Sequence, residues 1–185
     1  MKYPCYCLFV LMAGMLTTTP APATEAGMLY SWGDNTFAQL GNGDFPANPR
    51  PALMTDAVQI NAGNYYTVAL HTDGTVWAWG TNYYGQIGDG TTSDRYTPVQ
   101  VLNLADVSSV SAGYAHNLAL KTDGTVMVWG HNYDGELGDG THTDRTTPVQ
   151  VSGLTNVASV SAGYCFSLSA KSDGTVWAWG YNGYG

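Results

Sequence analysis

The sequence predicts an all-β fold in which four-stranded antiparallel sheets are stacked as the blades of a β-propeller. Three observations support this fold class: a period of about fifty residues, an Asp-Gly hairpin signal inside each period, and an unusual composition. The chain of 185 residues contains 23 Gly, 13 Tyr and 6 Trp. Glycine-rich turns between short aromatic strands are typical of such sheets.

The period is defined by a Trp-Gly pair that recurs in phase. The pairs are Trp32-Gly33, Trp79-Gly80, Trp129-Gly130 and Trp179-Gly180. Successive pairs are 47, 50 and 50 residues apart, and the shorter first period lacks three residues in one loop. We therefore assign residues 24–185 to repeats at 27–80, 81–130 and 131–180, and residues 181–185 begin the next repeat.

Four short strands are expected in each repeat. In the middle of the chain they fall at 98–101, 107–112, 117–122 and 125–129. The pair Asp123-Gly124 between the last two predicts a tight hairpin in which both turn residues have positive φ. Strand 125–129 is apolar on both faces, which is typical of a strand covered by sheets on either side.

Each repeat then continues into a turn-rich connection with one apolar anchor. The anchors are Leu40, Ile87 and Leu137. One four-stranded sheet cannot bury both of its faces, whereas radially stacked sheets cover one another, with Trp and Tyr side chains between them. A unit of this size therefore corresponds to one propeller blade.

The pattern A-G-x-x-x-x-L-A-L-K-x-D-G-T-V-x-x-W-G-x-N-x-x-G-x-L-G-D-G-T, which residues 112–141 carry, resembles the regulator of chromosome condensation repeat. Residues 62–91 and 162–185 match it too, so the resemblance covers nearly all of residues 27–185. It implies a seven-bladed β-propeller, which would need roughly 350 residues at this period. We expect the chain to be part of such a propeller, because it opens with the last strand of a blade and stops within a motif.

The first 23 residues differ from the repeats. Lys2 precedes an apolar run at 5–16, and Ala21-Pro22-Ala23 resembles a signal-peptidase site. This pattern predicts a secretory signal peptide at 1–23, although a buried N-terminal strand is the alternative. Cleavage would remove Cys5 and Cys7, leaving Cys165 without a disulfide partner. The mature chain is then expected in a secreted, periplasmic or cell-surface location, with no membrane insertion after cleavage.

The charge argues against several classes of partner. Six Lys and Arg stand against fourteen Asp and Glu, for a formal net charge of −8. So few cations cannot neutralise phosphates, so we expect neither nucleic acid nor an anionic membrane as a partner. No metal-binding His pattern, nucleophile motif or nucleotide loop occurs, so we expect no enzyme activity and no cofactor.

The repeated acidic residues have two readings. Asp89 and Asp94, like Asp139 and Asp144 in the next repeat, lie in D-G-T-x-x-D-R segments. They cap turns or form a calcium site, and turn capping is favoured because the order of an ordinary calcium loop is missing. Arg95 and Arg145 are expected to pair with nearby carboxylates.

The candidate binding residues are those that change between repeats. Exposed Tyr with Asn and Gly is a recognition composition, because it gives rigid contact area at low entropic cost. The predicted partner-binding residues are Tyr65, Tyr66, Tyr83, Tyr84, His116, His131, Tyr133, Asp134 and Phe166. The alternative is that these side chains cover the edges of blades.

Three functions remain open. The first is a secreted, non-enzymatic scaffold that binds a protein or cell-surface partner through Tyr-rich loops, similar in kind to secreted β-lactamase inhibitors of this family. The second is a guanine-nucleotide exchange factor-like regulator of a small GTPase, which the nuclear family member implies. That member has an extra wedge-shaped insertion in one blade, whereas the periods of 47, 50 and 50 residues in this chain contain no such insertion. The third is a structural repeat region of a larger surface protein.

Overall fold

The protein consists of β-sheets throughout the described part of the chain. The computed structural model describes residues 29–31, 35–41 and 52–184. The strands of the first half are β1 (Leu29–Ser31), β2 (Ala52–Met54), β3 (Ala57–Ala62), β4 (Tyr66–His71), β5 (Val76–Gly80) and β6 (Arg95–Gln100). Those of the second half are β7 (Val107–Ala112), β8 (His116–Lys121), β9 (Val126–Gly130), β10 (Arg145–Gln150), β11 (Val157–Ala162), β12 (Phe166–Lys171) and β13 (Val176–Gly180).

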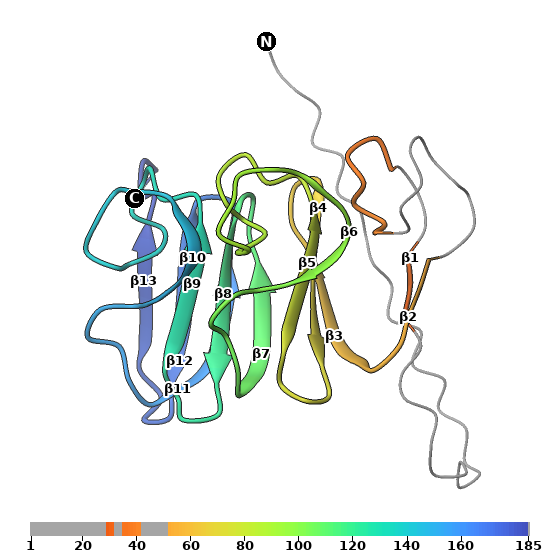
Figure 1. Cartoon of the computed structure of the whole chain (residues 1–185). Coiled ribbons are helices and arrows are strands. Elements are labelled where there is room, and N and C mark those ends of the chain that lie inside the picture. The colour runs from red at the N-terminus through yellow and green to blue at the C-terminus, as the bar shows by residue number, and fades with distance from the viewer. Residues whose placement is uncertain (1–28, 32–34, 42–51, 185) are drawn as a thin grey trace, which may run out of the picture.

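The strands form a row of antiparallel sheets that stand side by side (Figure 1). Two sheets have four strands, in the orders β3-β4-β5-β6 and β10-β9-β8-β7. A third sheet has the order β11-β12-β13, and β1 pairs with β2. The predicted architecture of four-stranded antiparallel sheets at a period of about fifty residues is therefore confirmed.

The Asp-Gly hairpins differ in detail from the prediction. Gly124 has a φ of 79°, whereas Asp123 does not have positive φ, so the expectation that both residues adopt it is wrong. Gly124 N donates to Lys121 O, and Lys121 N donates to Thr125 O. This is a three-residue loop that ends on a left-handed glycine. The Asp123 carboxylate instead accepts hydrogen bonds from the Thr125 amide and hydroxyl, at 2.9 and 2.6 Å.

The hydrophobic core lies between successive sheets. Val68 and Val76 of the first sheet belong to one buried cluster with Val107, Val110 and Trp129 of the second. Each sheet therefore provides half of the core that the neighbouring sheet needs, as in a repeat architecture. In β9, Val126, Val128 and Trp129 are fully buried, which confirms that this strand is covered on both faces.

A buried asparagine fixes the connection after β5 and after β9. Asn82 Nδ2 donates to Thr91 O and Ser93 O at 3.0 Å, and its Oδ1 accepts from Ile87 N at 2.9 Å. Asn132 makes the equivalent bonds in the next repeat. The apolar anchors Ile87 and Leu137 are fully buried beneath these loops.

The acidic residues of these connections cap their own loop. Asp89 accepts hydrogen bonds from the Thr91 amide and hydroxyl, and it pairs with Arg95. Asp139 pairs with Arg145 at 2.7 Å in the same way. Burial alone would raise the pKa of Asp89, but the hydrogen bonds from Thr91 and Arg95 outweigh it and lower that pKa. The arginines thus pair with carboxylates, as the sequence predicted.

Candidate partner-binding surface

The variable loops of all repeats meet at one end of the sheets, which we call the loop end. Tyr66 pairs with Gly80 across β4 and β5, so the loop before β4 and the loop after β5 lie at the same end. His116 pairs with Gly130 and Phe166 with Gly180 in the same register. The Asp-Gly hairpins lie at the opposite end, at the bottom of Figure 1.

Backbone hydrogen bonds connect the loops of successive repeats. Asn64 N donates to Tyr114 O at 3.0 Å, and Tyr114 N donates to Tyr164 O at 3.3 Å. Within a repeat, Thr81 N donates to Tyr65 O and His131 N to Ala115 O, both at 2.9 Å. The loops therefore form one continuous layer, held together by main-chain atoms that do not depend on side-chain identity.

Aromatic rings cover this layer. Phe37 packs on Tyr65 with ring centroids 4.4 Å apart, and Tyr114 packs on Tyr164 at 4.3 Å. Tyr84 meets the His131 ring edge-on at 4.4 Å. Such pairs fix ring orientation in addition to burying area. We define the aromatic surface as Tyr65, Tyr83, Tyr84, Tyr114, Tyr133 and Tyr164.

Most of the predicted binding residues reach this surface. Tyr83 and Tyr133 are 77 % and 76 % exposed, and Tyr65 is 44 % exposed. Tyr84, His131 and Asp134 are half-buried at the loop end. Tyr164 is also exposed, although it was outside the predicted set. Tyr114 and Tyr164 occupy the same position of successive repeats, and this recurrence was the sequence signal for including both in the predicted set.

Two of the predicted binding residues are instead inside the core. Tyr66 and His116 are fully buried, so the prediction that they contact a partner is wrong. The Tyr66 hydroxyl donates to His116 O at 2.9 Å, across to the next sheet. Tyr66 alternates in phase with Val68 and Leu70, which face the next sheet. At this position the alternative holds, because the Tyr66 side chain covers the edge of its blade and packs against the next one.

His116 takes the place of Tyr66 in the second sheet. Its Nε2 lies 3.1 Å from Ser167 Oγ in the third sheet, and Ser167 Oγ donates to Glu136 O at 2.7 Å. Burial, with a smaller contribution from nearby His131, lowers the pKa of His116 to about 4. The imidazole is therefore neutral at pH 7 and functions as a polar core side chain.

A buried carboxylate paired with histidine is a feature that the sequence pattern did not predict. The position carries Gln39, Gln86 and Glu136 in the three connections. Gln86 Oε1 accepts from Tyr84 N, and Glu136 Oε2 accepts from Asp134 N, both at 2.9 Å. The other oxygen of Glu136 lies 2.5 Å from His131 Nδ1. The change from Gln to Glu together with the change from Thr81 to His131 was the available signal.

Negatively charged side chains lie near Cys165, beside the aromatic surface. Burial, followed by the charges of Glu136 and Asp134, raises the pKa of the Cys165 thiol to about 11. Burial also raises the pKa of Tyr84, with added contributions from Tyr114, Tyr83 and Asp144. Cys165 is therefore a protonated, half-buried side chain at neutral pH, poorly suited to be a nucleophile.

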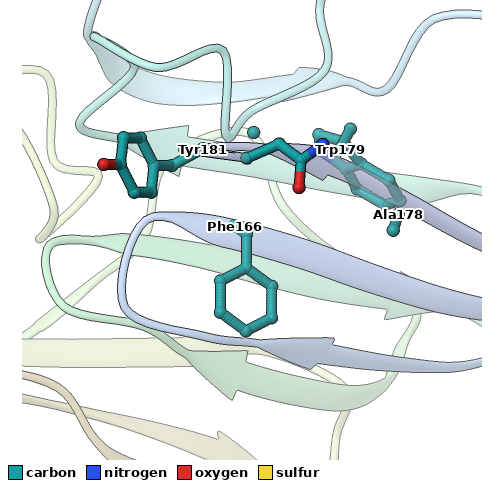
Figure 2. Close-up of a pocket in the computed structure, with 6 residues that line it drawn as sticks. Phe166, Ala178, Trp179 and Tyr181 are labelled. Carbon is teal, nitrogen blue, oxygen red and sulfur yellow. The ribbon is translucent and has the colours of Figure 1, made fainter. Parts of the chain in front are cut away.

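The third sheet has an open face beside the loop end. Phe166, Ala178, Trp179 and Tyr181 line a pocket of about 360 Å³, which Figure 2 shows. The matching residues of the first sheet, Tyr66 and Ala78, are buried with Ile87 and Trp129. The pocket therefore corresponds to the space that an inter-blade core occupies in the first repeat. Phe166, at 39 % exposed, belongs to this face rather than to the aromatic surface.

Within residues 29–31, 35–41 and 52–184, no group of three or more His, Cys, Asp or Glu is placed to hold a metal ion. In the same ranges, no helix has the length and hydrophobicity that crossing a membrane requires. The predicted signal peptide at 1–23 lies outside the described residues.

Sequence comparison identifies the class of protein. A family model for the regulator of chromosome condensation (RCC1) repeat matches residues 26–70, 73–120 and 123–170. A second model for the same repeat matches residues 57–86, 107–136 and 157–185. The chain therefore belongs to the RCC1 repeat family.

Particular relatives are known in sequence and structure. Human E3 ubiquitin-protein ligase HERC2 is 34 % identical over an alignment of 58 residues, and the match covers 29 % of this chain and 1 % of HERC2. Human WBSCR16 has a TM-score of 0.74 at 24 % identity, and yeast RCC1 (Prp20), solved with Kap60, has 0.72 at 25 %. The matches cover 82 % and 84 % of this chain, but only 42 % and 40 % of those chains. The chain thus spans less than half of the length of either solved structure.

Proposed function

We propose that this protein is a non-enzymatic propeller scaffold that binds a protein or cell-surface partner through its aromatic surface. The observation that carries the proposal is the exposure of Tyr83, Tyr133 and Tyr164 on loops that the repeat holds in place. Tyr combines a large apolar area with a hydroxyl and loses little side-chain entropy on binding. Such residues are enriched where protein interfaces derive most of their affinity.

Rigidity supports the same proposal. The loops bearing Tyr83 and Tyr133 are fixed by the buried side chains of Asn82 and Asn132, each of which bonds to several backbone groups. A loop that is already ordered avoids the entropic cost of ordering on association, which raises affinity for a given contact area. The residues that recur in each repeat, such as Asn82 and Asn132, thus hold the loops in place, and the exposed tyrosines on those loops are available for contacts.

We further propose that the mature chain acts outside the cytoplasm, following removal of residues 1–23. The positive start, the short apolar run and the small residues at 21–23 support export. Determining the N-terminal sequence of the protein from the cells that make it tests this proposal. A new N-terminus at Thr24 is expected, and retention of Met1 or Lys2 in the mature protein would contradict export.

Site-specific photo-cross-linking tests the binding proposal. A photoreactive phenylalanine analogue replaces Tyr133 on the aromatic surface, and in a control chain it replaces Val58, which is 53 % exposed on β3. Irradiation in the natural extracellular fraction should give a discrete protein or polymer adduct from position 133 alone. Equal adducts from both positions, or none from 133, would refute the proposal and favour a purely structural repeat region.

A second candidate function follows from the structural neighbours. One structure similar to this chain, Prp20p from Saccharomyces cerevisiae, is described with its binding properties to Gsp1p and histones; it has a TM-score of 0.68 at 23 % identity. This likeness motivates a test of exchange-factor activity. We expect no acceleration of labelled nucleotide release from a panel of small GTPases, and robust acceleration would replace the scaffold proposal by this one.

A further inference from the structure

We infer that the aromatic surface recognises an arginine-bearing, cationic segment of its partner. This inference rests on the proposed function and specifies the chemistry of the partner. It is carried by the distribution of charge at the loop end and by the rings that lie between the charged groups.

Carboxylates outnumber cations at the loop end. Residues 81–95 and 131–145 contain six carboxylates but two arginines. Both arginines are already engaged, Arg95 with Asp89 and Arg145 with Asp139. The two lysines of the described chain, Lys121 and Lys171, lie at the opposite end of the sheets, beside the Asp-Gly hairpins. Within the described residues, the loop end therefore carries more negative than positive charge and has no lysine for an anionic partner.

The negative groups lie among the rings. Asp144, from the second repeat, is exposed, and its Oδ1 accepts a hydrogen bond from Asn132 N at 2.8 Å. Its charge also contributes to the raised pKa of Tyr84 in the first repeat. Asp134 follows Tyr133 directly and acts on the Cys165 thiol of the third repeat. Glu136 is fully buried and is paired with His131, so it contributes to the field without reaching a partner.

Carboxylates beside tyrosine faces are suited to guanidinium groups. A guanidinium is planar, so it can stack on a ring while its N–H groups donate to a carboxylate. An ammonium group lacks the planar fork and is more strongly hydrated, so the same arrangement favours arginine over lysine. Tyr133, which is 76 % exposed, is followed directly by the carboxylate of Asp134. Tyr83 is followed by Tyr84, on which the charge of Asp144 acts.

Binding of defined peptides tests this inference. The probes are fluorescein-labelled twelve-residue peptides with six Arg, six Lys, six Gln or six Glu residues, alternating with Gly. Fluorescence anisotropy with the whole chain should give binding of the Arg peptide at least tenfold tighter than that of the Gln peptide. The affinity should fall as salt is raised, because exposed charges are screened. The Glu peptide should not bind.

A matched pair of double variants separates a site from general attraction to an acidic protein. The test variant is Asp134→Asn with Asp144→Asn. The control is Asp56→Asn with Asp106→Asn, two exposed residues near the hairpin end whose positive φ values of 64° and 59° asparagine also tolerates. Both variants change the net charge equally. We expect the test variant, and Tyr133→Ala, to weaken the Arg peptide about tenfold and the control to leave it unchanged.

Several results would overturn the inference. Equal weakening of Arg-peptide binding by both double variants would mean that the peptide responds to net charge alone and not to a site. If the Arg peptide does not bind at all, the inference is wrong. Equal affinity for the Lys peptide would overturn the assignment to arginine. A cross-link from position 133 to a partner without a cationic segment would refute this inference while leaving the proposed scaffold function intact. Circular dichroism of each variant verifies that the sheets are retained.

Discussion

His116 and Tyr66 occupy the same place in neighbouring repeats and close the same contact with different chemistry. The Tyr66 hydroxyl donates to two carbonyls of the next sheet, Gly113 O at 3.2 Å and His116 O at 2.9 Å. The His116 ring approaches Ser167 through Nε2, and the Phe166 backbone also acts on the ring. Unlike the tyrosine hydroxyl, the buried imidazole can take up a proton in acid, and burial disfavours its charged form.

Replacing His116 by Tyr should reduce the acid sensitivity of the fold. Burial depresses the pKa of His116 to about 4, below the ordinary value of 6.5 for histidine. As the pH falls, the unfolded chain binds the proton first, so the contribution of the neutral imidazole is complete above 6.5 and is lost between 6.5 and about 4. One depressed histidine of this kind is worth roughly 3 kcal/mol. Urea unfolding at pH 7 and pH 4.5 should show a smaller difference for His116→Tyr than for the natural chain.

The reverse substitution provides the control. Tyr66→His places a second buried imidazole at the equivalent site, so the loss of stability between pH 7 and pH 4.5 should increase. If His116→Tyr loses as much stability on acidification as the natural chain, protonation of His116 does not contribute to acid unfolding.

At the scale of the element, β5 and β13 show that one sequence can have two environments. Both strands read VWAWG. In β5, Val76 is fully buried against the next sheet, whereas Val176 in β13 is 71 % exposed on the open face. Local propensity is identical in the two strands, so the difference arises entirely from what lies across the face.

Truncation of these two valines should therefore have unequal effects. Val76→Ala should reduce the free energy of unfolding by about 2 kcal/mol, because it removes buried methyl groups and leaves a cavity. Val176→Ala removes methyl groups that already contact water, and the expected change is within about 0.5 kcal/mol. Denaturant unfolding followed by tryptophan fluorescence measures both. Equal losses would mean that the face of β13 is covered in solution.

At the scale of the whole molecule, stability should be highest in the middle of the row of sheets. The sheet of β7 to β10 has a neighbour on each side, and its residues belong to both large core clusters. The sheet of β11 to β13 has a covered face and an open one (Figure 1). In a repeat protein each unit is stabilised by its contacts with the neighbouring units, so an outer sheet opens more easily than an inner one.

Hydrogen exchange should report this gradient. Peptides from β8 and β9 are expected to exchange most slowly, and the equivalent peptides from β12 and β13 faster, although their repeat sequences match closely. Mass spectrometry of exchange over minutes to hours measures both sets in one sample. Equal protection of the two sheets would contradict a gradient and indicate that the chain opens as one cooperative unit.

The sequence by itself determined the features that depend on neighbours along the chain. The fifty-residue period, the strands and the place of each hairpin follow from local alternation and turn residues. The anchors Ile87 and Leu137 also follow, because each is the one apolar residue in a glycine-rich loop. These are properties of a few consecutive residues, and repetition in phase made each of them observable several times.

Tertiary structure decided what depends on contacts between repeats. It placed Tyr66 and His116 inside the core, brought Asp144 to Tyr84, and gave the two VWAWG strands opposite environments. It also set the backbone of Asp123, because the three-residue loop requires positive φ at Gly124 alone. The physical reason is that burial and local field are produced by side chains about fifty residues away, and the periodicity of a single strand carries no record of which sheet covers it.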